Sequence, residues 1–245
     1  MRVPGANEIL NIWERSGGKS PAERSIDLLY VSSTGAEDPA ALSIGQRNTL
    51  LFRLREKLFG PSLSNIADCP SCHERVEWVS GISDLLIAGG ERDVLATEVF
   101  TLNAEPYEIQ FRLPNSYDML RVYADPVYQS SPERLYWDCI QEVKKGMDGY
   151  NAADLPQEVL DQLDRRMEAE DPQADISMLL CCPNCAHAWE MAFDICSYLW
   201  IEIDNWAKHA LREVATLASA FGWSESEILG MSPRRRRLYL EMIKQ

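Results

Sequence analysis

Cys69-Pro70-Ser71-Cys72 and Cys182-Pro183-Asn184-Cys185 are two copies of one Cys-Pro-x-Cys pattern, 113 positions apart in a chain of 245 residues. Each copy brings two thiolates to one side of a tight turn, and tetrahedral zinc binds four sulfurs at about 2.3 Å. Four sulfur ligands complete the tetrahedron, which favours a closed structural site over a catalytic one. The two copies therefore predict one structural zinc ion. Its predicted ligands are Cys69, Cys72, Cys182 and Cys185.

The sequence that follows each copy matches as well. After the last cysteine, the two copies can be matched at three further positions, each at the same distance from that cysteine in both. The matched pairs are Val76 with Trp189, Glu77 with Glu190, and Ile82 with Ile195. This shared register predicts two similar β-hairpins that clasp a single ion, which is a zinc ribbon split by a long insertion.

Other roles for the cysteines remain open at this stage. Cys-x-x-Cys also occurs in redox-active pairs and in disulfides, and the knuckles of an ordinary zinc ribbon lie only about 15–20 residues apart. Cys181, His73 and His187 lie close enough to compete as ligands. Neighbouring strand positions point to opposite faces, so we expect Cys181 to pack instead of binding metal. Cys139 and Cys196 fall within helical apolar patterns and are expected in the core.

Composition limits the class of protein. The apolar and charged fractions, 46% and 25%, are ordinary for a soluble globular chain. A net charge of −14 disfavours nucleic-acid binding as the main function. The N-terminus lacks the apolar core of a secretory signal, and no run of about 18 apolar residues predicts a membrane span. We therefore expect a cytoplasmic protein with reduced cysteines.

Apolar periodicity predicts an α+β fold: a split zinc ribbon with an inserted β-hairpin and helical segment, and a C-terminal three-helix module. The expected domains are an N-terminal extension (1–44), the split ribbon with its insertion (45–194) and the helical module (195–245). The expected helices are short ones near residues 9–13, at 156–169 and at 224–230, and others at 45–60, from 117, at 132–145, at 195–221 and from 233. The expected hairpin covers residues 98–113.

The sequence contains no catalytic constellation. The three histidines, His73, His187 and His209, are scattered, and none accompanies a nucleophile motif. We therefore expect neither an enzyme nor a small-molecule substrate. The segment 148–175 holds nine acidic residues against two arginines. No calcium-loop pattern accompanies them, so a solvated helical face is favoured over a divalent-metal site.

The C-terminal helices carry the residue types that usually anchor protein interfaces, namely aromatic residues and arginine. The residues expected to bind a partner are Trp223, Arg234, Arg235 and Tyr239. The arginine run 234–237 also suggests phosphate contacts of a helix-turn-helix. The acidic balance of the chain favours an acidic protein neighbour over nucleic acid.

Several segments resemble the baseplate hub assembly family of T-even type contractile phages. They are residues 50–61 running into Ala67-Asp68-Cys69-Pro70-Ser71-Cys72, then 111–120 and 171–175. The form with two cysteine knuckles is similar to members found in phage-like contractile injection system clusters. Residues 212–242 resemble a helical motif of tail and injection-system proteins.

This resemblance, which covers about residues 45–245, implies a non-enzymatic baseplate component or an assembly chaperone. Its expected partners are baseplate or tail proteins, with no nucleic acid, no membrane span and no small-molecule substrate. It is expected in the cytoplasm during assembly, and the family leaves open whether it stays in the finished particle. The alternative is a zinc-ribbon regulatory protein associated with nucleic acid.

Overall fold

The computed structural model describes residues 1–34, 38–87, 98–131 and 134–243. The chain forms two compact units: Met1–Thr34 with Cys196–Gln245, and Gly35–Ile195. The first 34 residues therefore belong with the C-terminal helices, a pairing that the sequence did not predict. The expected boundaries at residues 44 and 194 stay predictions.

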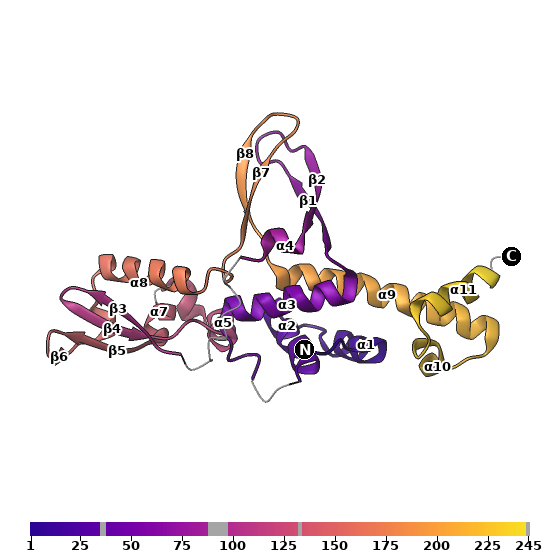
Figure 1. Cartoon of the computed structure of the whole chain (residues 1–245), viewed down its shortest axis with the longest axis horizontal. Coiled ribbons are helices and arrows are strands. Elements are labelled where there is room, and N and C mark those ends of the chain that lie inside the picture. The colour runs from indigo at the N-terminus through magenta and orange to yellow at the C-terminus, as the bar shows by residue number, and fades with distance from the viewer. Residues whose placement is uncertain (35–37, 88–97, 132–133, 244–245) are drawn as a thin grey trace. The chain divides into compact units, whose positions relative to one another are not determined.

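The first unit is helical (Figure 1). Its helices are α1 (Ala6–Arg15), α2 (Pro21–Ser32), α9 (Ile195–Phe221), α10 (Glu225–Leu229) and α11 (Pro233–Ile243). Leu10 of α1 packs in one buried cluster with residues of α9 and α10, including Leu217 and Ile228. Trp13 also donates a hydrogen bond to Asp204, 2.9 Å between Nε1 and Oδ1. These long-range contacts explain why the two ends of the chain form one unit.

The second unit contains two antiparallel hairpins beside the helix α3 (Figure 1). The elements are α3 (Ile44–Phe59), β1 (Ser62–Asp68), β2 (Arg75–Gly81), α4 (Ile82–Leu85), β7 (Ser177–Cys181) and β8 (Ala188–Ala192). Ser43 caps α3 in a capping box with Gln46, and Gly60 ends it at a positive φ of 90°. Phe52 of α3 stacks on Phe193, which follows β8.

The inserted part of this unit is a four-stranded antiparallel sheet in the order β3-β4-β5-β6, with α8 on one face (Figure 1). Ile109 and Phe111 of the sheet and Leu163 of α8 are fully buried in one cluster. The elements are β3 (Phe100–Ala104), β4 (Tyr107–Phe111), α5 (Ser116–Ala124), α6 (Pro126–Ser130), α7 (Arg134–Cys139), β5 (Ile140–Lys145), β6 (Asp148–Gly149), the 3₁₀ turn η1 (Ala152–Asp154) and α8 (Gln157–Glu170). The predicted α+β class and the predicted hairpin are confirmed.

The predicted helix 132–145 is wrong over its second half. Helix α7 ends at Cys139, and Ile140–Lys145 forms β5, which pairs with β4. Ile140 and Val143 are β-branched and suit a strand, and Gly146 at φ 65° turns the chain into β6. Hydrogen bonding to β4, about thirty residues earlier in the chain, therefore determines the structure of this segment, although its apolar residues have helical spacing. Pro132, the predicted first residue of this helix, lies outside the described residues.

Asp118 of α5 holds a partly buried charge network together. Its carboxylate accepts two hydrogen bonds from Arg112, at 2.6 and 2.8 Å, one from the Asn115 backbone and one from Arg121. Burial raises the pKa of Asp118, but the bonds from Arg112 and Asn115 outweigh it, so the pKa is lowered overall. The ionised form therefore stabilises the fold.

We expect Asp118→Asn to lower the free energy of unfolding by about 1–2 kcal/mol at neutral pH, because charge-assisted bonds are replaced by neutral ones. Because the folded pKa is depressed, the wild-type advantage is present above the unfolded pKa and is lost as the pH falls through the folded value. Denaturant unfolding of both proteins across acidic pH measures this. A difference that persisted unchanged at the lowest pH would contradict it.

Candidate metal centre

The two Cys-Pro-x-Cys turns are built in the same way. Each closes with two backbone hydrogen bonds of 2.9 Å. In the first turn, Cys69 N–H donates to the Glu74 carbonyl, and His73 N–H donates to the Cys69 carbonyl. The equivalent bonds of the second turn run from Cys182 to His187 and from Ala186 to Cys182.

The residue after each turn repeats as well. His73 and Ala186 adopt left-handed backbone conformations, with φ of 59° and 57°. Such conformations are uncommon for residues other than glycine, so their recurrence at the same position shows that the two turns share one geometry. Beyond the turns, Ile82 and Ile195 are both buried, and each is the first residue of a helix. The matching register seen in the sequence is thus a matching structure.

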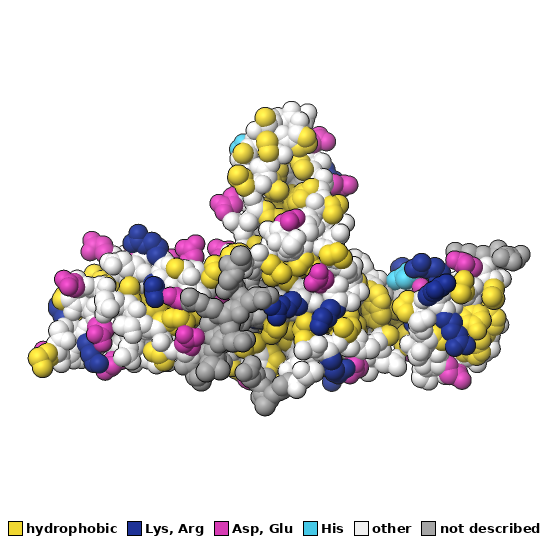
Figure 2. Space-filling model, in the orientation of Figure 1, with side chains coloured by type: hydrophobic (Ala, Val, Ile, Leu, Met, Phe, Trp, Pro, Cys, Tyr) yellow, Lys and Arg dark blue, Asp and Glu magenta, His cyan; other side chains and the backbone are white. Residues whose placement is uncertain are grey.

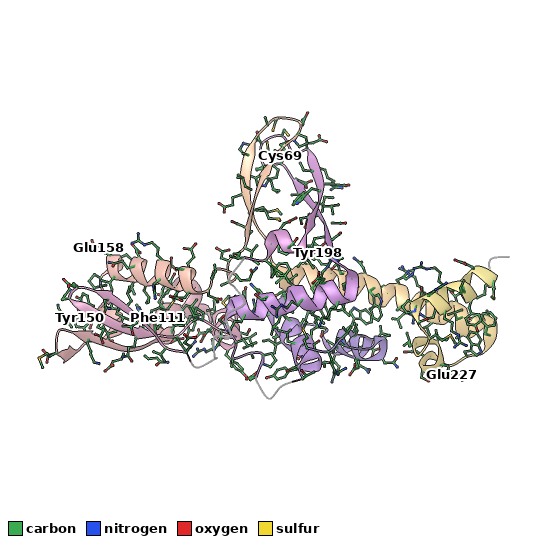
Figure 3. The ribbon with its side chains drawn as sticks, in the orientation of Figure 1. Cys69, Phe111, Tyr150, Glu158, Tyr198 and Glu227 are labelled. Carbon is green, nitrogen blue, oxygen red and sulfur yellow. The ribbon has the colours of Figure 1, made fainter. Side chains whose placement is uncertain are left out.

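The four knuckle cysteines meet near the tips of the two hairpins, where Figure 3 labels Cys69. The Sγ atoms of Cys69 and Cys185 are 3.7 Å apart, and those of Cys72 and Cys182 are 3.6 Å apart. All four sulfurs lie within 4.8 Å of one another. A tetrahedron with metal–sulfur bonds of 2.3 Å has edges of about 3.8 Å, whereas a disulfide needs about 2.05 Å. The geometry therefore fits a tetrahedral metal site.

A backbone N–H of each turn favours the thiolate form of one cysteine, but crowding among the four thiols opposes it. The Glu74 N–H, with smaller contributions from neighbouring thiols, lowers the pKa of Cys72 to about 7. The His187 N–H acts in the same sense on Cys185, but the hydrogen bond with Cys72, burial and the hydrogen bonds with the other two thiols raise its pKa to about 12. Four crowded thiols thus cannot all ionise easily by themselves. A bound cation would remove this obstacle, because metal binding releases the protons.

The remaining cysteines lie outside this cluster. Cys139 and Cys196 are buried, which confirms their predicted place in the core. Cys181 is exposed, so the expectation that it packs is wrong. The reason is that a two-stranded hairpin has one covered face: Cys182 is turned inward, and Cys181 lies on the open side. Among the described residues, the metal-compatible cluster includes neither His73 nor His187.

A polar clasp that no sequence pattern predicted joins the bases of the two hairpins. Gln173, which precedes β7, is 1% exposed. Its Nε2 donates to the Leu85 carbonyl at 3.0 Å, and its Oε1 accepts from the Ile87 N–H at 2.8 Å, which fixes the end of the first hairpin's helix α4. Asn48 of α3 donates to the Gln173 carbonyl at 3.0 Å. These bonds thus join the hairpins at their bases, at the end opposite the cysteine cluster.

The predicted partner-binding residues lie at one end of the helical unit. Trp223 and Tyr239 are half-buried and pack edge to face, with ring centroids 4.8 Å apart. The Arg235 guanidinium lies 5.7 Å from the Tyr239 ring centroid, and Arg234 is exposed. Arg236, by contrast, is buried and donates to Glu213 and to the Met231 carbonyl. One arginine of the run therefore stabilises the helical unit, and the others lie on its surface.

The surface of α11 is basic and apolar together (Figure 2). Leu238 and Met242 are 50% and 61% exposed, and they follow Arg234 at four-residue steps. Residues at this spacing lie on one side of a helix. Within the described ranges, no helix is both long and apolar enough to cross a membrane.

Comparison with known proteins places these features in one family. The sequence profile described as T4 bacteriophage base plate protein matches residues 14–199. The match includes all four knuckle cysteines and ends shortly after α9 begins, so the C-terminal helices lie beyond it. No curated protein and no solved structure matches the chain.

Proposed function

Because this chain belongs to the T4 bacteriophage base plate protein family, we propose that it works as a non-enzymatic part or assembly chaperone of a contractile-tail or injection-system baseplate. The family match over residues 14–199 carries the baseplate assignment. Its proposed partners are other baseplate or tail proteins. The assembly role would place it in the cytoplasm while baseplates form, and incorporation would place it in the particle.

The proposed zinc site gives this function a structural basis. Cys69 and Cys72 come from one hairpin, and Cys182 and Cys185 come from the other, with the inserted sheet between them in the chain. One ion bound to all four would fix both ends of this insertion. Four thiolates suit zinc better than the hard cations calcium or magnesium. We therefore assign zinc a structural and not a catalytic role.

The C-terminal helices are the proposed docking element. Trp223 and Tyr239 support the surface from within the unit, while Arg234 and Arg235 lie on it. Arg236 is buried and bonded to Glu213. The other three arginines of the run are exposed. Arginine with neighbouring apolar side chains is typical of protein interfaces.

We expect the double variant Arg234→Glu with Arg235→Glu to fold and bind zinc normally, yet to lower the yield of assembled baseplates about tenfold or more. Reversing charges at an interface adds repulsion as well as removing attraction. Arg165→Glu with Arg166→Glu is the matched control, because it reverses two adjacent surface arginines on α8. Complementation of a deletion strain, followed by particle counting, measures the effect. Equal yields for both variants would remove Arg234 and Arg235 from the interface.

Quantitative mass spectrometry of purified particles distinguishes the two forms of the proposal. A fixed copy number per baseplate would establish an incorporated component. Presence in assembly intermediates alone would establish a chaperone. Normal baseplates in a strain that lacks the chain would contradict both.

A further inference from the structure

A cavity of about 290 Å³ opens between α8, α7 and the start of α3, away from the cysteine cluster. Its apolar lining comes from Ile44, Leu135 and Met167, with Pro114 and Ala174 completing it. This volume is just below the usual range for small-molecule sites, about 300–1,000 Å³. The cavity therefore suits a single side chain better than a larger molecule.

The charged side chains that line this cavity are all acidic among the described residues. Asp164, Glu168, Asp171 and Asp175 contribute carboxyl groups, and no lysine, arginine or histidine is among the described lining residues. Asp171 is the most buried of the four, with 8% exposed, and it already accepts a bond of 2.9 Å from the Gly45 N–H. Asp164 accepts a bond of 2.7 Å from the Tyr136 hydroxyl. Within the described parts of the chain, neither Glu168 nor Asp175 has an ion-pair partner.

We propose that this cavity binds one arginine side chain of a neighbouring protein chain. The apolar lining suits the aliphatic stem, and the carboxylates around it suit a cation. Arginine fits better than lysine, because its planar guanidinium presents five donors that can bond several carboxylates and can stack on the ring of Tyr136. The proposal rests on the proposed function only for the identity of the neighbour, a baseplate protein.

The side chain itself is the most direct probe. The zinc-loaded full chain, with ¹³C-labelled isoleucine and methionine methyl groups, is titrated with Nα-acetyl-arginine methylamide. We expect saturable shifts of the Ile44 and Met167 methyl signals with a Kd of about 1–10 mM, which is typical of one isolated contact group. The citrulline analogue has the same shape without the charge, and it should bind at least about tenfold more weakly.

Paired variants separate the cavity from the general negative charge. Glu168→Gln with Asp175→Asn removes two charges from the lining, whereas Glu158→Gln with Asp161→Asn removes two charges from α8 outside the cavity. We expect the first pair to raise the Kd about tenfold and the second to change it less than twofold.

Three results would overturn the proposal: equal loss of affinity in both pairs, equal binding of arginine and citrulline analogues, or no saturable shift. Tighter binding of the corresponding lysine derivative would overturn the choice of arginine. The titration uses no baseplate, so its outcome is independent of the assembly test.

Discussion

Serine in place of Cys182 should abolish stable zinc binding and leave the two hairpins unfolded at their tips. Cys182 is 1% exposed, and its sulfur lies 3.6 Å from that of Cys72. Structural zinc contributes roughly 10–16 kcal/mol of apparent binding free energy in small peptides, compared with about 5–15 kcal/mol for the stability of a whole domain. The loss of one ligand should therefore lower the melting temperature more than any other single change considered for this chain.

The chain supplies its own control for this experiment. Cys181→Ser makes the same chemical change one residue earlier, but Cys181 is exposed and lies outside the cluster. We expect Cys181→Ser to retain one zinc per chain and to change the free energy of unfolding by no more than about 0.5 kcal/mol. Elemental analysis and thermal unfolding of the wild type and both variants provide the measurements. A wild-type protein without zinc, or a Cys182→Ser protein with full zinc and unchanged stability, would sink the assignment.

The loss of stability in Cys182→Ser should also be confined to one part of the fold. Hydrogen exchange in Cys182→Ser should accelerate first in β1, β2, β7 and β8, because these strands form isolated two-stranded sheets. The four-stranded sheet has its own buried cluster with α8, including Phe111 and Leu163, so its amides should stay protected.

The parts of the fold that the sequence predicted are those governed by local rules. The repeated Cys-Pro-x-Cys pattern fixed the turns, because each turn is closed by bonds within six residues, such as Cys69 to Glu74. Helix α3 was predictable because its apolar period, its Ser43 cap and its terminal Gly60 agree. The distant pairing of the two cysteine turns could be predicted for a chemical reason, since a zinc site needs four ligands.

The parts that were missed depend on contacts far apart in the chain. Ile140 to Lys145 is a strand because β4 offers it a partner, and helical spacing alone could not reveal this. The first 34 residues join the C-terminal helices through Leu10, whose partners are about 200 residues away. Helix α2 was a different miss, because its capping box at Ser20 and Glu23 is visible in the sequence.

Gln173→Leu should lower the free energy of unfolding by about 3–5 kcal/mol. Leucine has a similar size but no polar atoms, so the Ile87 N–H and the Leu85 carbonyl would each lose a buried partner. An unsatisfied buried group costs about 1–3 kcal/mol. The matched control is Gln162→Leu on α8, where the side chain is exposed and bonds only to its own helix at Glu158. That change should stay within about 0.5 kcal/mol.

Zinc binding and the Gln173 clasp should prove coupled, because they hold opposite ends of the same pair of hairpins. With zinc bound, Gln173→Leu should still keep one ion per chain, since its side chain contacts residues at the base, Leu85 and Ile87. After a chelator removes the metal from the Gln173→Leu variant, neither end of its hairpin pair is held. The variant should then lose protection in β1 and β7, whereas the metal-free wild type retains it near the clasp. Equal protection in the two metal-free proteins would show that the clasp contributes nothing once the metal is gone, and that zinc alone orders the hairpins.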